Sequence, residues 1–333
     1  MISPRESLAE INRVGQLSGQ GRYIEVLNFL EARGPGVVAS SPTLALHFGI
    51  AHGRLGRHQE GARWVDSALR GAVDRGDRAL QARALNVRGA IALEGGRIDE
   101  AEGFFLGALA EAKELEDHGT VGRCCNNLGI IANLRGQHTR AIASYTMALA
   151  AFQRAGLPQG VGETENNLRI TYRDLGELPR ALEAADRAVE VAERSGNRAL
   201  VAFALGGRAE IRALAGEPEL AHREIQRALS LHREVGDVVG EAEDLRVLAL
   251  ALAELGDVDA AEELYRQVIE RAAEHGRPLL AAEAGRALAE LLADGERPAE
   301  ARDAARAARV QFSLLGAVAE VRRLDRLLES RLA

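Results

Sequence analysis

Six asparagines lie between positions 86 and 167, and three of them recur at a spacing of forty residues. The set is Asn86, Asn126, Asn127, Asn133, Asn166 and Asn167. An asparagine amide offers one hydrogen-bond acceptor and two donors, so a row of such amides can hold a peptide backbone whatever its sequence. Asparagine is also a mediocre helix former, so its recurrence inside predicted helices needs a reason.

Three arginines, Arg83, Arg123 and Arg173, flank these asparagines. A guanidinium binds carboxylates through strong, charge-assisted hydrogen bonds, which suits acidic side chains of a bound segment. Two alternatives stay open from the sequence. The amides can instead bond to neighbouring backbone carbonyls or turns, and the arginines can simply be solvated.

The remaining reactive side chains form no catalytic or metal-binding pattern. The 8 histidines are scattered, and adjacent Cys124 and Cys125 lack the two-residue gap of zinc ligands. A disulfide between neighbouring cysteines would be strained, so we expect two small buried thiols in a reducing compartment. No glycine-rich loop follows a predicted strand. The sequence therefore predicts no enzyme, no metal site and no cofactor.

The elements that position these residues follow the same period. Glycine recurs every forty residues at Gly56, Gly96, Gly136, Gly176, Gly216 and Gly256, and again at Gly76, Gly156, Gly196, Gly236, Gly276 and Gly316. Small residues keep the period at Gly61, Ala101, Ala141, Ala181, Ala221, Ala261 and Ala301. A fixed period of this size is typical of a solenoid of stacked helix pairs. The second glycine series has no member at position 116.

Residues 119–158 show one period most clearly. Apolar spacing predicts a helix over about 121–134 and a second over about 139–155, separated at Gly136 and ended by Gly156. The connections are so short that the two helices must be antiparallel neighbours. Gly129 and Ala141 are small because the helices cross closely there.

This pattern resembles the tetratricopeptide repeat, on Asn127, Leu128 and Gly129, then Gly136, Ala141, Tyr145 and Ala148. The forty-residue period is similar to the long-repeat subclass of kinesin light chains, Pins-type adaptors and bacterial regulators of this kind. The resemblance implies an all-α, right-handed αα superhelix of about eight repeats. We expect one solenoid over 1–333, with a degenerate first repeat at 4–34, seven regular repeats at 42–316 and a capping helix at 317–332. The intervening segment 33–42 is predicted to be a loop.

The resemblance also implies a concave groove lined by the first helix of each pair, with groove positions at fixed offsets from the small residue at Gly129. These offsets make Arg83, Asn86, Arg123, Asn126, Asn127, Asn133, Asn166, Asn167 and Arg173 the predicted peptide-binding residues. Glu210, Glu243, Glu254, Glu283 and Glu290 make the later repeats more acidic, with Arg246 and Arg286 among them. Internal ion pairing and a second, cation-specific segment are both open. Arg169 departs from the pattern, because it replaces the small residue.

Composition limits the partners. The formal net charge is −7 and the isoelectric point is about 5.7, which gives no general attraction for nucleic acid or anionic membranes. The first 16 residues show no signal-peptide pattern, and no run is apolar enough to span a membrane. We therefore expect a cytoplasmic protein. The bias toward alanine, arginine and glycine indicates coding bias in the source genome, and the resemblance to bacterial regulators implies a bacterial source.

Two functions are compatible with such an array. The first is a non-enzymatic adaptor that binds an extended or helical segment of another protein in the groove. The alternative is a ligand-responsive sensor of the bacterial peptide-pheromone or transcription-regulator type. Homo-oligomers through an end repeat are a further hypothesis, because residues 314–328 are rich in leucine and valine.

Overall fold

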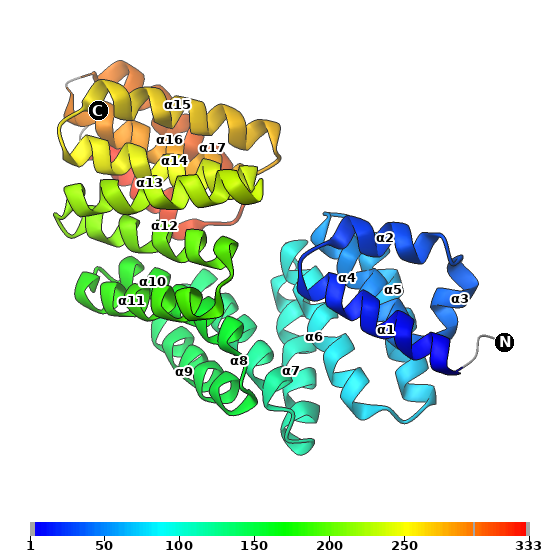
Figure 1. Ribbon diagram of the computed structural model, residues 1–333. Coiled ribbons are helices and arrows are strands. Elements are labelled where there is room, and N and C mark those ends of the chain that lie inside the picture. The colour runs from blue at the N-terminus through cyan, green and yellow to red at the C-terminus, as the bar shows by residue number, and fades with distance from the viewer. Residues whose placement is uncertain (1–3, 296, 331–333) are drawn as a thin grey trace. The chain divides into compact units, whose positions relative to one another are not determined.

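The computed structural model describes residues 4–295 and 297–330, and every regular element in that part of the chain is an α-helix (Figure 1). The helices fall into two compact units, which are described separately. The first unit runs to Ala132 and includes Ala143–Leu157. The second unit contains Asn133–Ile142 and the chain from Pro158 onward.

The first unit begins with one helix pair and continues with pairs of more uniform length. Its helices are α1 (Pro4–Gly19), α2 (Tyr23–Glu31), α3 (Pro35–Ser40), α4 (Pro42–Arg54), α5 (His58–Asp74), α6 (Arg78–Glu94), α7 (Ile98–Glu114), α8 (His118–Leu134) and α9 (His138–Ala155), of which α9 begins in the second unit. We call the first helix of each pair the A helix (α4, α6, α8) and the second the B helix (α5, α7, α9).

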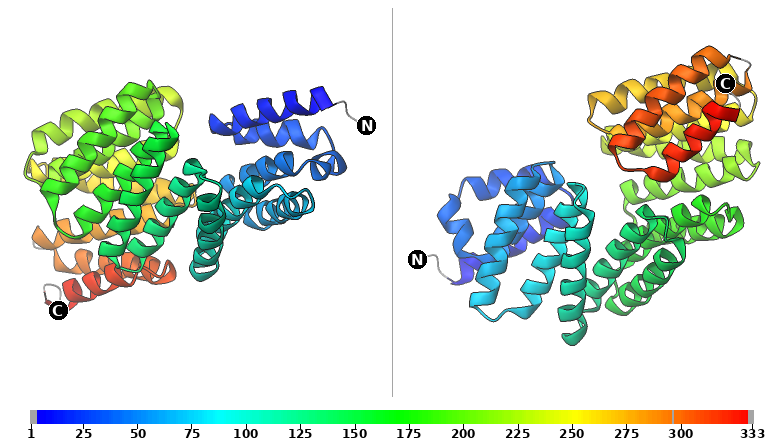
Figure 2. Two further views of the ribbon diagram at one scale, coloured as in Figure 1. Left: turned by 90° about the horizontal axis from the view of Figure 1, so that it is seen from below. Right: turned by 180° about the vertical axis from the view of Figure 1, so that it is seen from behind.

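The second unit repeats the same arrangement, as the two further views in Figure 2 show. Its A helices are α10 (Pro158–Asp174), α12 (Arg198–Leu214), α14 (Val238–Glu254) and α16 (Pro278–Asp294). Its B helices are α11 (Leu178–Ser195), α13 (Pro218–Val235), α15 (Val258–Glu274) and α17 (Pro298–Leu314), and α18 (Val318–Ser330) follows. The seven regular pairs predicted from the period are therefore present as α4 to α17.

The periodic glycines end the helices. Gly196 and Gly236 adopt left-handed φ values of 67° and 72° at the ends of α11 and α13, where a residue without Cβ caps the helix at little cost. The glycine missing from position 116 is replaced by Glu116, whose φ of 54° is the one positive value found among non-glycine residues of the described chain. The backbone conformation therefore keeps the period even where the residue type does not.

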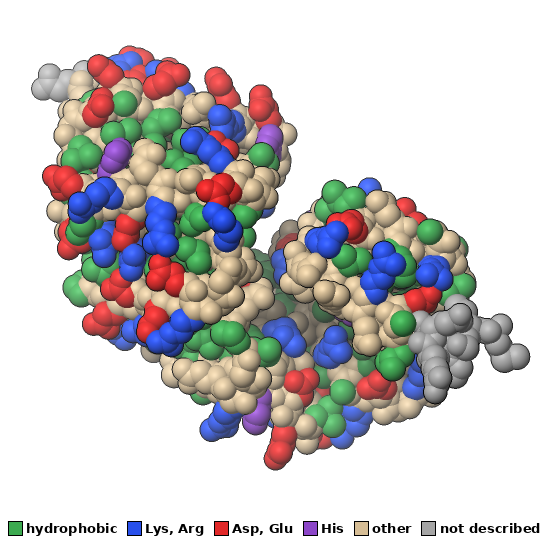
Figure 3. Space-filling model, in the orientation of Figure 1, with side chains coloured by type: hydrophobic (Ala, Val, Ile, Leu, Met, Phe, Trp, Pro, Cys, Tyr) green, Lys and Arg blue, Asp and Glu red, His purple; other side chains and the backbone are tan. Residues whose placement is uncertain are grey.

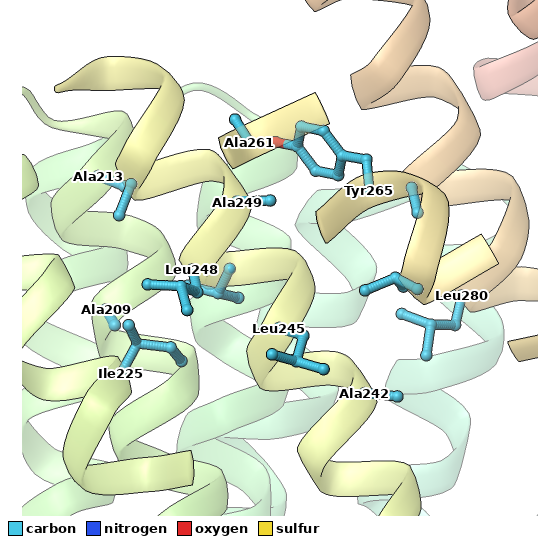
Figure 4. Packing of buried hydrophobic residues seen from close by; sticks show 14 of the residues in the cluster. Ala209, Ala213, Ile225, Ala242, Leu245, Leu248, Ala249, Ala261, Tyr265 and Leu280 are labelled. Atoms are coloured by element: carbon cyan, nitrogen blue, oxygen red, sulfur yellow. The ribbon is translucent and has the colours of Figure 1, made fainter. Parts of the chain in front are cut away.

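Close helix crossings explain the small residues inside the helices. A Cβ built on Gly129 of α8 would lie 2.5 Å from Cε1 of the Tyr145 ring on α9, so only glycine fits. In the second unit, alanines alternate with larger side chains between helices, as Figure 4 shows for Ala209, Leu245, Ala249 and Tyr265. Small residues let the helices approach, and leucine, isoleucine and tyrosine fill the space between repeats.

Two predicted segments differ in detail. The segment predicted as a loop at 33–42 contains a short helix, α3, because Pro35 stands at its first turn and Val38 packs into the core. At the other end, α18 buries Leu324 and Leu327 against the neighbouring pair, as a cap requires. Leu314 and Val318 stay largely exposed there, so self-association through this end remains a prediction.

Candidate functional site: the A-helix face

Successive A helices lie next to one another within each unit, and we call the surface that they form the A-helix face. In the first unit it comprises α4, α6 and α8, and in the second α10, α12, α14 and α16. All nine predicted binding residues are on these helices. Arg83 and Arg123 are exposed, Asn126, Asn127, Asn133, Asn167 and Arg173 are half-buried, and Asn86 and Asn166 are buried.

In the first unit, asparagine amides link neighbouring A helices. The Nδ2 of Asn127 on α8 donates to Oδ1 of Asn86 on α6 at 3.2 Å, and the Cys124 thiol lies 3.5 Å from the same oxygen. These contacts use the carbonyl of Asn86. These two amides therefore link neighbouring repeats through their side chains, and not through the backbone carbonyls or turns that the sequence left open as an alternative.

Arginine affects the same face through its charge. Burial, and next the Arg83 cation, lower the pKa of His47 on α4 to about 4, so this imidazole is neutral at pH 7. His47 Nδ1 lies 3.0 Å from the Ser18 hydroxyl, which gives the neutral ring a partner. Arg83 itself stays exposed at the surface of the first unit.

In the second unit, Asn133 is strongly engaged within the chain. Its Oδ1 accepts a hydrogen bond from Thr171 Oγ1 at 3.1 Å and lies 2.9 Å from His138 Nδ1. Its Nδ2 lies 3.4 Å from the Asp174 carboxylate. Asn133 therefore ties the start of this unit to α10.

A buried polar cluster joins three A helices around one carboxylate, Glu210 on α12. This carboxylate accepts hydrogen bonds from Arg169 at 2.7 Å, Arg173 at 3.1 Å and Arg246 at 2.9 Å. Burial alone would raise the pKa of Glu210, but the three cations outweigh burial and hold the pKa well below its usual value. We call these four residues the Glu210 cluster.

Arg169, the residue that broke the column of small side chains, is thereby explained. Its side chain is buried, and its Nε donates to Asn166 Oδ1 at 3.0 Å while its Nη1 binds Glu210. A Cβ on Gly207 would lie 2.8 Å from Arg169 Nε. Glycine at 207 therefore makes room for the guanidinium that arrives from the preceding repeat.

The acidic residues of the later repeats are also paired internally. Arg286 lies 3.1 Å from Glu290, Arg246 lies 3.7 Å from Glu283, and Arg277 lies 3.6 Å from Glu243. On the face shown in Figure 3, basic and acidic side chains are intermixed over the second unit. These contacts favour internal pairing over a separate cation-specific segment.

A small hollow lies on the A-helix face of the second unit. Its volume is about 60 Å³, and its walls come from α10, α12, α13 and α14. Its lining residues are Arg169, Phe203, Gly206, Gly207, Glu210, His232, Glu243, Asp244, Arg246 and Val247. The sequence prediction missed His232 and Asp244, although both break columns of small or apolar residues.

The cysteines are free and buried, as predicted. Burial raises the pKa of Cys124 to about 12, so its thiol stays protonated and unreactive at neutral pH. Within residues 4–295 and 297–330, no group of three histidine, cysteine or acidic side chains is arranged to hold a metal ion. None of the helices in these ranges is both long and apolar enough to cross a membrane.

The helix pairs and the A-helix face define an α-solenoid, a class of repeat protein that offers a surface for binding. Models of the tetratricopeptide repeat match residues 80–154 and 246–313. Together with the helix pairs between these stretches, the matches show that the chain is a tetratricopeptide repeat protein. No curated protein sequence matches it.

Several solved structures share the fold. A Rap protein complexed with Competence and Sporulation Factor has a TM-score of 0.61 and 16% identity, over 98% of this chain and 97% of that one. The apo form of the quorum sensor NprR from B. thuringiensis has a TM-score of 0.55 and 16% identity, over 99% of both chains. Aspartyl phosphate phosphatase F from Bacillus subtilis has a TM-score of 0.66 and 16% identity, over 88% of this chain and 73% of its own. At these identities the similarity shows the fold alone.

Proposed function

We propose that this chain is a non-enzymatic scaffold that binds an extended or helical segment of a partner protein on its A-helix face. The observation that carries this proposal is the row of polar side chains on α6 and α8, where Arg83 and Arg123 are exposed and Asn126 and Asn127 are half-buried. Amides suit a peptide backbone, and the two guanidinium groups suit its carboxylates. The partner segment that we expect is therefore acidic.

The two units contribute unequally to this proposal. In the second unit, Asn133, Asn166 and Arg173 all hold internal hydrogen bonds, and the Glu210 cluster occupies much of the face. Displacing such buried, charge-assisted bonds would cost a ligand most of what it gains. We therefore assign a structural role to these three side chains, as to the Asn127–Asn86 contact of the first unit. We assign partner binding mainly to the first unit because its Arg83 and Arg123 are exposed.

The test is a pull-down from a lysate of the source organism, quantified by mass spectrometry. Wild type is compared with Arg83→Ala/Arg123→Ala, and with a control, Arg63→Ala/Arg70→Ala, that removes two exposed arginines from the B helix α5. We expect a partner that wild type and control recover equally and the A-helix variant at least tenfold less, a loss of about 1.4 kcal/mol. Equal recovery by all three would refute binding on this face.

A second candidate is a peptide-responsive sensor. The observation that favours it is the similarity to the Rap protein complex and to NprR over nearly the full length of all three chains. In this case a peptide would change the pitch of the helix stack. Small-angle scattering with and without the segment found by the pull-down would show compaction, whereas superimposable profiles at saturation would leave the scaffold as the function.

A further inference from the structure

A buried histidine–aspartate pair connects α13 and α14 in the second unit. His232 Nδ1 lies 2.7 Å from Asp244 Oδ2, and the two side chains are 3% and 4% exposed. The positions forty residues earlier hold Ala192 and Ala204, and those forty residues later hold Ala272 and Ala284. An ionisable pair therefore occupies positions that hold alanines in the two neighbouring repeats.

The backbone on both sides is shaped around this pair. A Cβ on Gly240 would lie 2.6 Å from His232 Nε2, and a Cβ on Gly206 would lie 2.5 Å from Asp244 Oδ1. Gly206 stands where the three preceding repeats carry Asn86, Asn126 and Asn166, so the row of asparagines ends where the Asp244 carboxylate needs the space. Burying an ionisable pair costs more desolvation free energy than burying two alanines, so a gain in stability alone does not explain why this pair is present.

Charged groups of both signs surround the pair. They are Asp237, Glu243 and Arg246 from α14 and its N-cap, Glu210 from α12, Arg169 from α10, Arg277 from the N-cap of α16, and Arg271 from α15. Glu210 holds Arg169 and Arg246, and Arg271 lies 3.5 Å from Glu241 instead. Glu243, which lies 3.6 Å from Arg277, and Asp237 both raise the pKa values of His232 and Asp244 through their negative charge.

Both members of the pair hold protons more tightly than in an unfolded chain. Burial raises the pKa of Asp244 to about 6, although its hydrogen bond with His232 opposes this rise. Burial would lower the pKa of His232, but the hydrogen bond and charge of Asp244 outweigh it and raise that pKa. A folded state with raised pKa values binds more protons than the unfolded state, so this contribution to stability is largest in acid and is lost as the pH rises.

We propose that the His232–Asp244 pair is a proton-binding switch, which stabilises the α13–α14 junction and adds positive charge to the neighbouring hollow as the pH falls from 8 to 5. Between these limits the pair passes from neutral histidine with carboxylate, through the ion pair, to the doubly protonated form. The charge of the hollow wall thus rises by up to two units. This inference does not depend on the proposed function, because the proton is the only ligand that it requires.

The test compares urea unfolding of the full chain at pH 5 and pH 8 for wild type and His232→Ala/Asp244→Ala, which installs the alanines of the neighbouring repeats. Asp244 has a pKa of 3.8 in the unfolded chain and about 6 in the folded chain. Its titration alone should therefore lower the wild-type folding equilibrium constant about tenfold between pH 5 and pH 8, and the titration of His232 should lower it further. All other groups titrate in both proteins and cancel in the comparison. The ratio of the wild-type to the variant folding constant is compared at pH 5 and pH 8. A change in this ratio of less than twofold would overturn the proposal.

A second measurement keeps the test independent of the variant's folding. Amide hydrogen exchange of wild type, corrected for intrinsic rates, should show more protection of α13 and α14 at pH 5 than at pH 8, with little change in α16 and α17. Asp244→Asn retains a hydrogen-bond acceptor but loses the titrating carboxylate, and should flatten most of this difference. Equal pH dependence in wild type and Asp244→Asn would assign the effect to other groups and refute the switch.

Discussion

The Glu210 cluster allows a quantitative test of what holds the second unit together. Glu210→Leu removes the carboxylate and places at this position the residue that the next repeat has, Leu250. The Arg169 side chain, 8% exposed, then keeps Asn166 but loses its counter-charge. Arg173 retains its contact with Asp174, and Arg246 lies near Glu283. Most of the lost stability should therefore come from the unpaired charge of Arg169.

The expected magnitudes follow from this distribution. Removing one partner of a buried ion pair costs about 3–5 kcal/mol, which we expect for Glu210→Leu. Arg169→Ala leaves Glu210 with two arginines and removes one charge-assisted hydrogen bond, so it should cost about 1.5–3 kcal/mol. The double variant buries no such unpaired charge, and should cost about 2 kcal/mol less than the sum of the single variants.

The assay is urea unfolding at pH 7 followed by far-ultraviolet circular dichroism for all four members of the cycle. An exposed pair in the same unit, Arg227 with Glu193, gives the matched control, since its cycle should show a coupling under about 1 kcal/mol. Raising the salt concentration should weaken only the control coupling. Additive effects of Arg169→Ala and Glu210→Leu would refute the cluster as an energetic unit.

Two predictions concern the first unit. Gly129→Ala should destabilise the chain by about 1–3 kcal/mol, because its Cβ would lie 2.5 Å from the buried Tyr145 ring. Gly103→Ala, with no neighbour within 4 Å inside helix α7, should instead stabilise by about 0.5–1 kcal/mol; equal effects of the two changes in urea unfolding would contradict this packing. His47 has a folded pKa of about 4, below its unfolded value of 6.5, so stability should fall as the pH drops below 6.5, by about 2 kcal/mol at pH 5. His47→Gln should lack this loss, and an unchanged acid sensitivity in the variant would argue against a buried neutral imidazole.

Much of the fold was predictable from sequence because its determinants are local and repeated. The glycines at helix ends and the small residues at crossings recur in most pairs, so several columns give the same period independently. The helix pairs from α4 to α17 and the family follow from that agreement, and both are confirmed. The short helix α3 was missed because it falls outside the period and depends on Val38 reaching the core.

The binding face was less predictable. The offset of a residue from the small residue of its repeat predicts its place on the A helix, but not the group to which its side chain bonds. Sequence alone placed Asn86, Asn133 and Asn166 on the A helices, and the structure adds that each bonds within its own unit. Binding of a ligand by these residues stays a prediction. A single continuous solenoid over 1–333 stays one also, since the two units are defined separately.

The sequence by itself determined the forty-residue period, the helix pairs and the residues that depart from the pattern. Only the tertiary structure decided what those departures do. In the sequence, Gly206 and Gly207 interrupt a row of polar residues. In the structure, the space beside Gly206 is occupied by Asp244 of the following repeat, and the space beside Gly207 by Arg169 of the preceding repeat. The physical reason is that backbone turns and crossings depend on nearby residues, whereas the buried charges of the Glu210 cluster are paired with side chains 36 to 41 positions away.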